Sequence, residues 1–300
     1  MPVSGGDGEM RPDIHRTDCA EPQAGVVERL SKLPPFRPAC LHLLAVSTET
    51  GSAMDDFANI FLGDPAMAAD LLLVANSMEF GSRCRIETIR HALSYLGLER
   101  VRSLASTIAL RMEVGQTPHE SVRPLWLHSI ASAVIAEQLG ALHGVQGVYT
   151  AALVHDLGRL GLLSVEHERY ALVLGTVFED IYEANRMEEI LFGMDHCKTG
   201  AFLGEKWGFP IGLQASMFAH HANEQMSLPR RIVQAACEIA ASLGFPEVQR
   251  RDQDASDELC KKAGLSPDAV CDQIAKRMAT LEGGAPAMAP RALHGEKVFT

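Results

Sequence analysis

The spacing of apolar residues most constrains the fold of this chain. In several separate stretches an apolar side chain recurs every three or four residues, which places these side chains on one face of a helix. Ile89, Leu93 and Leu96 form one such stripe, and a second lies within residues 101–108. Residues 33–115 contain no alternating apolar and polar pattern of useful length. The sequence therefore predicts an all-α fold.

Turn-forming residues divide the chain into two groups of helices. Asp64 and Pro65 are predicted to begin a helix as N-cap and first residue, because aspartate accepts from free backbone N–H groups and proline needs no such bond. The polar stretch 116–123 contains a proline and is predicted to separate two subdomains. The first, at 26–115, carries no catalytic cluster, and the second, at 124–245, carries the candidate site.

The two ends of the chain are predicted to contribute little to the core. Residues 1–24 are polar and contain glycine, so we expect a disordered tail there. Within residues 246–300, Asp268 to Leu281 can form one amphipathic helix. The glycine- and proline-rich sequence after it is predicted to be a mobile tail.

Composition narrows the class of protein. The chain has 300 residues, of which 47% are hydrophobic, and its formal net charge is -11. This negative charge argues against nucleic acid or an anionic membrane as the main partner. No apolar run approaches the roughly 20 residues that a membrane span needs. The seven cysteines include no C-x-x-C pair, so we expect reduced thiols in a cytoplasmic protein.

The His155-Asp156 pair is the first candidate for chemistry. The apolar residues 151–154 run directly into it, and Gly158 is predicted to end this helix. An imidazole and a carboxylate can bind the same divalent ion of the zinc, iron or manganese type. A histidine favoured by the helix dipole beside a solvated aspartate would look the same. The meaning of the pair therefore depends on the other histidines.

Further imidazoles occur at the predicted buried edges of other helices. His128 lies on the apolar stripe of a long helix that can run from Pro124 to about His143. An antiparallel return can bring it beside the His155-Asp156 pair, although an inward histidine is also common as a packed core residue. We predict that at least one of the remaining histidines joins them around one cavity. The candidate metal ligands are His128, His155, Asp156, His196, His220 and His221.

Many short motifs recur in an order that resembles the HDOD family, a divergent branch of the HD metal-dependent phosphohydrolase superfamily. The match covers about residues 26–245 and implies a helical N-terminal subdomain packed on an HD-like helical bundle. The matching segments are Leu33-Pro34-Pro35, Asp64-Pro65-Ala66, Leu72 to Ser77, Ile89 to Gly97, Trp126-Leu127-His128-Ser129, His155-Asp156-Leu157-Gly158, Glu188 to Gly193, His196, Trp207-Gly208-Phe209-Pro210 and His220-His221.

The resemblance implies a metal held by a first histidine, the His-Asp pair and a distant aspartate. His128, His155 and Asp156 match three of these four ligands, and Cys237 stands at the fourth. The remaining three histidines match positions that bind a second metal in some relatives. Relatives that cleave cyclic dinucleotides often carry a lysine where this chain has Arg159, and their Gly-Tyr-Pro signature is absent.

Two functions remain open at this point. The resemblance favours a regulatory module of signal transduction that binds a protein or nucleotide partner without efficient catalysis. The alternative is a metal-dependent phosphohydrolase acting on a nucleotide or phosphodiester. In that case the metal would lower the pKa of a bound water, Asp156 would act as ligand and base, and Arg159 could pair with phosphate.

The cysteine at position 237 leads to a testable prediction. Hard ions prefer oxygen donors, and a buried neutral thiol does not replace the charge of a carboxylate. We therefore expect weak magnesium or manganese binding, while zinc could recruit the thiolate or the extra histidines could compensate and hold iron or zinc. Cys237→Asp should strengthen manganese binding, measured by titration of the purified protein. Tight manganese binding by the native chain that this substitution leaves unchanged would show that residue 237 does not occupy the ligand position.

Overall fold

The computed structural model describes residues 22–34, 38–46, 52–77, 79–81, 85–114, 120–222, 226–252 and 257–282. The predicted disordered tail lies outside these residues up to residue 21, and residues 22–24 already belong to the first helix. The predicted mobile tail after residue 282 and the first half of the predicted hinge, residues 116–119, also lie outside them.

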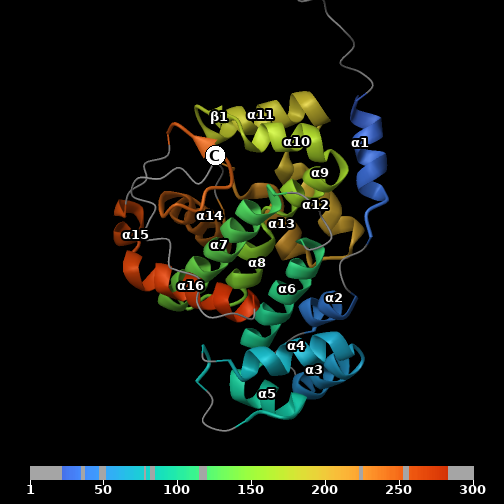
Figure 1. Cartoon of the computed structure of the whole chain (residues 1–300), viewed down its shortest axis with the longest axis vertical. Helices are drawn as coiled ribbons and strands as arrows, with labels where there is room; N and C mark the ends of the chain where they lie inside the picture. The colour runs from blue at the N-terminus through green and yellow to red at the C-terminus, as the bar shows by residue number, and fades with distance from the viewer. Residues whose placement is uncertain are drawn as a thin grey trace, which may run out of the picture.

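The described part of the chain is mostly helical, with two short strands, so the predicted all-α fold is confirmed (Figure 1). The first helices are α1 (Pro22–Ser31), α2 (Pro38–Ala45), α3 (Ala53–Leu62), α4 (Pro65–Ala75), α5 (Ile89–Leu96) and α6 (Leu98–Val114). The central helices are α7 (Val122–His143), α8 (Val148–Val154), α9 (Leu157–Val165), α10 (His167–Leu174) and α11 (Ile181–Phe192). The last are α12 (His196–Lys206), α13 (Ile211–Ala219), α14 (Leu228–Ser242), α15 (Glu258–Lys262) and α16 (Pro267–Glu282).

Local sequence signals explain several of these boundaries. The Asp64 carboxylate accepts a hydrogen bond from the backbone N–H of Met67, and Pro65 is the first residue of α4, as predicted. The predicted C-terminal helix is α16, whose residues Val270 and Ile274 are buried. Two strands of two residues each, β1 (Val177–Phe178) and β2 (Gln249–Arg250), pair in parallel.

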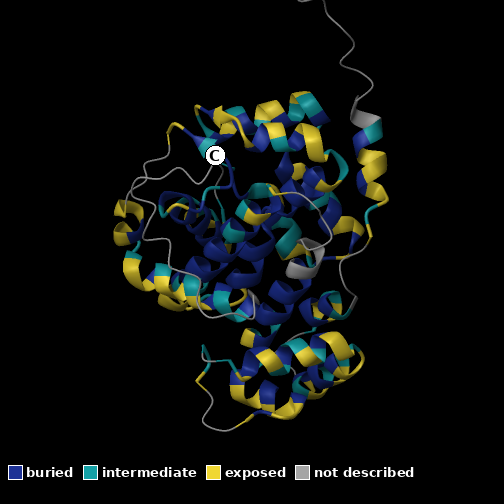
Figure 2. Cartoon of the chain, in the orientation of Figure 1, coloured by how far each residue is buried: buried dark blue, intermediate teal, exposed yellow. Residues whose placement is uncertain are grey.

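The apolar side chains form two clusters. The smaller one joins α3, α4 and α5 to the first half of α6, and these helices lie together at the bottom of Figure 1. The larger one surrounds α7 and also includes Val26 and Leu30 of α1 and the end of α6. In Figure 2 most of the ribbon in the middle of the molecule has the colour of buried residues. The predicted division at 26–115 and 124–245 stays a prediction, and α1 packs with the second group.

Helix α7 is the axis of the larger cluster and packs against α8 and α14. Among the described residues, α7 is the single unbroken helix that is long and apolar enough to cross a membrane. However, 72% of its apolar stretch is buried inside the protein. The α3–α4 pair passes the same test only if its 114° bend is ignored. Burial of this kind is that of a core helix.

The segment after the His155-Asp156 pair differs from the sequence prediction. Gly158 does not end a helix, because α8 already ends at Val154 and Gly158 lies inside α9. A Cβ atom on Gly158 would overlap the carbonyl oxygen of His196 and lie 2.6 Å from the backbone nitrogen of Gly200. Glycine is therefore required by the close crossing of α9 and α12. Gly200 lies at the same crossing, because a Cβ atom on it would lie 3.3 Å from the backbone nitrogen of Gly158.

A matched pair of glycine substitutions tests this crossing. Gly158→Ala should lower the free energy of unfolding by about 3 kcal/mol or more, because overpacking here meets backbone atoms that cannot rotate away. Gly212→Ala in α13 places its Cβ in open space and should stabilise the protein by about 0.5–1 kcal/mol. Urea unfolding of both variants measures the difference. Equal stabilities would contradict the observed backbone contact.

Candidate metal centre

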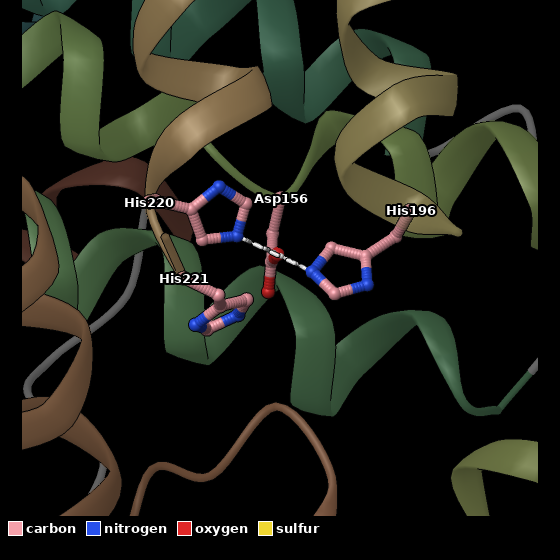
Figure 3. Close-up of side chains that lie close together, drawn as sticks. All are labelled: Asp156, His196, His220 and His221. Carbon is pink, nitrogen blue, oxygen red and sulfur yellow. Dashed lines mark hydrogen bonds and ion pairs between the residues drawn. The ribbon is translucent and has the colours of Figure 1, made fainter. Parts of the chain in front are cut away.

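The structure brings all six predicted ligands together. His128 comes from the middle of α7, and His155 and Asp156 form the turn between α8 and α9. His196 is the first residue of α12, and the His220-His221 pair follows the end of α13. Each of the six residues is at most 6% exposed. Figure 3 shows Asp156 between His220 and His196, with His221 beside them.

The first group of donor atoms belongs to Asp156, His196 and His220, and three of these atoms form a small triangle. The His196 Nε2 and His220 Nε2 atoms are 3.3 Å apart. Asp156 Oδ1 lies 3.4 Å from His196 Nε2 and 3.2 Å from His220 Nε2. A tetrahedral zinc site with metal–nitrogen bonds of about 2.0–2.1 Å has edges of roughly 3.3 Å. The three atoms therefore have the spacing of ligands that share one ion, and His221 lies in the same group.

A second group lies on the other side of the same carboxylate. His128 Nε2 and His155 Nε2 are 3.3 Å apart, and they lie 3.7 Å and 3.8 Å from Asp156 Oδ2. Cys237 Sγ is 3.6 Å from His128 Nε2. This last distance matches the roughly 3.6 Å edge expected when zinc binds nitrogen at about 2.05 Å and sulfur at about 2.3 Å. Asp156 thus offers one oxygen to each group.

Backbone carbonyls and one carboxylate orient the imidazole rings. The Nδ1 atoms of His128, His155 and His220 lie 2.7 Å, 2.5 Å and 2.8 Å from the carbonyl oxygens of Phe245, Ala152 and Met217. His196 Nδ1 lies 2.7 Å from Glu188 Oε2. When Nδ1 carries the proton for such a bond, the Nε2 lone pair is free to bind a metal. The four rings therefore present Nε2 toward Asp156.

The Arg159 guanidinium lies fully buried beside the first group. Its Nε donates to Asp156 Oδ2 at 3.2 Å, and its Nη1 donates to Glu188 Oε1 at 2.8 Å and to the Tyr170 hydroxyl at 3.2 Å. Its Nη2 is 3.3 Å from His196 Nε2. A metal ion bound by Asp156 and His196 would therefore lie beside the positive Arg159 guanidinium, which contacts the same two side chains.

The two groups differ in their electrostatics. Burial lowers the pKa of His155 to about 3, so this ring stays neutral with a free lone pair. Burial also opposes charge on His220, but Cys197 and Asp156 outweigh it and raise the pKa to about 9. Burial and Arg159 likewise oppose charge on His196, yet Cys197, Glu188 and Asp156 hold its pKa well above the ordinary value. The His196 side of Asp156 therefore attracts positive charge, as a proton or as a metal ion.

Glu188 begins one of the matching sequence segments but was given no role in the site, and neither Cys197 nor Glu247 was singled out. Glu188 lies on the inward face of α11, on the same stripe as Ala184 and Phe192. The position of this acidic residue on an otherwise apolar helix face could have identified Glu188 as a candidate site residue. Cys197 Sγ is 3.5 Å from His196 Nε2, and Glu247 is grouped with His221 and Cys237. The structure therefore adds three buried groups to the predicted six.

Substitution of Glu188 tests whether this buried network holds the site. Glu188→Ala removes the carboxylate that pairs with His196 Nδ1 and with Arg159 Nη1, and should cost about 3–5 kcal/mol of stability. Glu189→Ala removes a neighbouring carboxylate whose pair with Lys198 is half-exposed, and should cost less than about 1 kcal/mol. Denaturant unfolding compares the two. A small loss for both would contradict the central place of Glu188.

Comparison with known proteins identifies the family of this chain. The model of the HDOD domain matches residues 33–223. An HDOD domain protein of unknown function from Geobacter sulfurreducens superposes with a TM-score of 0.68 at 21% identity, covering 89% of this chain and 97% of that one. A Shewanella amazonensis SB2B protein, named as a proposed phosphohydrolase, superposes with a TM-score of 0.62 at 21% identity. The match covers 86% of this chain and 96% of that one.

Two further matches extend the comparison. A Marinobacter aquaeolei VT8 protein, named as a proposed signal transduction protein, gives a TM-score of 0.62 at 19% identity, covering 86% of this chain and 60% of that one. An uncharacterized Treponema pallidum protein is 22% identical over 210 residues, which are 69% of this chain and 41% of that protein. These structural likenesses show the fold, and the family match covers more than half of the sequence. The chain belongs to the HDOD domain family.

Proposed function

We propose that this chain is a regulatory module of cytoplasmic signal transduction whose His-Asp centre holds a divalent cation without efficient catalysis. It would act through a protein or nucleotide partner. The observation that carries this proposal is the burial of the whole centre. All six candidate ligands are at most 6% exposed, and Arg159 is fully buried among protein acceptors.

Burial argues against phosphoester hydrolysis in this conformation. A metal-dependent hydrolase needs room at the ion for a water and for the phosphoryl oxygens. Arg159, the residue that could pair with phosphate, already donates to Asp156, Glu188 and Tyr170. Because its donors serve these partners, the guanidinium acts as an internal counter-charge. Such a centre suits a structural or signalling role better than turnover.

The donor set suits iron or zinc better than magnesium. Imidazoles outnumber carboxylates in it, and imidazole binds zinc and iron well, whereas magnesium prefers oxygen ligands. His196 and His220 supply nitrogen to the first group, and Asp156 supplies the oxygen. Manganese is expected to bind this centre more weakly.

The alternative function is a metal-dependent phosphohydrolase, and one specific observation favours it. The two oxygens of Asp156 face different imidazole pairs, His196 with His220 and His128 with His155. A carboxylate between two ligand groups is typical of two-metal sites that stabilise attacking and leaving oxygens. Movement that exposed the centre would be needed for this activity.

Elemental analysis combined with a turnover screen separates the two functions. The purified chain should contain iron or zinc, and removal of the metal by a chelator should lower the melting temperature. Asp156→Asn should lower the metal content, whereas Asp272→Asn, which removes an exposed carboxylate on α16, should not.

The screen itself covers nucleotides, cyclic dinucleotides and a chromogenic phosphodiester. We expect no metal-dependent turnover above the buffer rate. Turnover that depends on metal and disappears in Asp156→Asn would replace the regulatory proposal with the hydrolase. A metal content that Asp156→Asn leaves unchanged would show that this carboxylate holds no ion.

A further inference from the structure

The Arg277 side chain of α16 is a buried cation that joins segments far apart in the sequence. Its Nε donates to Glu79 Oε1 at 2.7 Å, and its Nη2 lies 3.5 Å from Glu137 Oε2 of α7. Its guanidinium carbon lies 5.1 Å from the centre of the Tyr149 ring. The Arg277 side chain is only 7% exposed. Because removal of a charge from water is costly, these neighbours are needed to hold the guanidinium there.

Glu79 belongs to a turn that is firmly tied to the smaller cluster. The turn lies between α4 and α5, and the Tyr95 hydroxyl of α5 donates to the carbonyl oxygen of Phe80 at 2.7 Å. The Asn76 side chain closes the same connection, because it donates to the Ile86 carbonyl and accepts from the Ile86 N–H, at 2.8 Å each. A displacement of Glu79 is therefore passed on to α5.

Tyr149 connects Arg277 to the helix that leads to the candidate metal centre. It lies in the first turn of α8, and the His155-Asp156 pair follows directly after that helix. The Tyr149 hydroxyl lies 2.9 Å from the hydroxyl oxygen of Thr107 on α6. Arg277 therefore contacts the beginning of the short helix whose end positions two of the candidate ligands.

Helix α16 is attached to the two clusters in different ways. In the described structure its buried apolar residues belong to the larger cluster and none belongs to the smaller one; they are Val270, Ile274, Met278 and Leu281. A cavity of about 350 Å³ lies beside the joint, between the beginning of α6, the end of α7 and the turn before α8. The Arg277–Glu79 pair therefore links α16 to the smaller cluster through a polar contact next to open space.

We propose that α16 is a latch. The Arg277–Glu79 pair fixes the smaller cluster relative to α8, and its release loosens both α5 and the turn that carries His155 and Asp156. A buried ion pair suits such a contact, because it adds little net stability over an apolar contact but is costly to leave half-broken. Helix α16 lies beyond residue 223, where the match to the HDOD domain ends. Regulation of the metal centre by this latch rests on the proposed function, whereas the latch itself is tested without a metal.

Hydrogen–deuterium exchange of the full chain, followed by mass spectrometry, measures this coupling. In Arg277→Gln, backbone amides of α5 and α8 should exchange at least about 10-fold faster, because loss of one partner of a buried ion pair favours local opening. Helices α10 and α11, at the opposite end of the molecule in Figure 1, should exchange as in the wild type. Glu79→Gln should give the same pattern, and the double variant should add little to either single one.

Lys276→Gln is the matched control. Lys276 is the neighbouring cation on α16, and it is exposed. Its substitution should leave exchange in α5 and α8 unchanged. Circular dichroism checks that each variant is folded, and Glu79→Gln, which leaves α16 intact, carries the test if Arg277→Gln does not fold.

The outcomes separate the latch from the proposed function. Unchanged exchange of α5 or of α8 in Glu79→Gln would overturn the latch. Faster exchange confined to α16, or equally fast in α10 and α11, would show a contact that only stabilises and would overturn it too. An effect of Lys276→Gln as large as that of Arg277→Gln would assign the change to net charge instead of the pair. Absence of metal from the purified chain would contradict the proposed function alone.

Discussion

The backbone crossing of α9 and α12 is the constraint on which the candidate centre depends. Gly158 and Gly200 let the two helices touch without a Cβ atom between them. Asp156 lies just before the crossing on one chain segment, and His196 lies just before it on the other. The 3.4 Å distance between the Asp156 and His196 donor atoms therefore follows from a contact between two glycine-bearing helices.

Charge balance in the interior is the second constraint. Asp156 and Glu188 bring two buried carboxylates to the centre, and Arg159 brings one buried guanidinium. A positive charge on His196 or His220, or a metal ion, makes up the difference. In either case Arg159 bonds both carboxylates and gives them one permanent positive neighbour.

The sequence predicted most of the fold because helical periodicity is a local signal. The apolar stripe of α7, the cap at Asp64 and the C-terminal helix could all be read from a few adjacent residues. Gly158 was misread because a glycine that ends a helix and one that admits a neighbouring helix look the same in sequence. Only the position of α12 distinguishes them.

The candidate site was predicted less completely, for a similar reason. The histidines could be found because each lay at a predicted buried helix edge. Glu247 follows Phe245-Pro246 in a connecting segment, where nothing local distinguishes a buried acid from a solvated one. Its burial depends on α14, on His221 and on the strand pair that follows. A pattern within one sequence segment does not predict such contacts between distant segments.

The smallest element of secondary structure has a consequence for the innermost histidine. Pairing of Val177 with Gln249 and of Phe178 with Arg250 ties the segment after α14 to the segment before α11. That same segment carries the Phe245 carbonyl, which fixes the His128 ring. Displacement of β2 from β1 would therefore act on the segment whose Phe245 carbonyl contacts the His128 ring. The two-residue sheet therefore connects the segment before α11 to the segment that contacts His128.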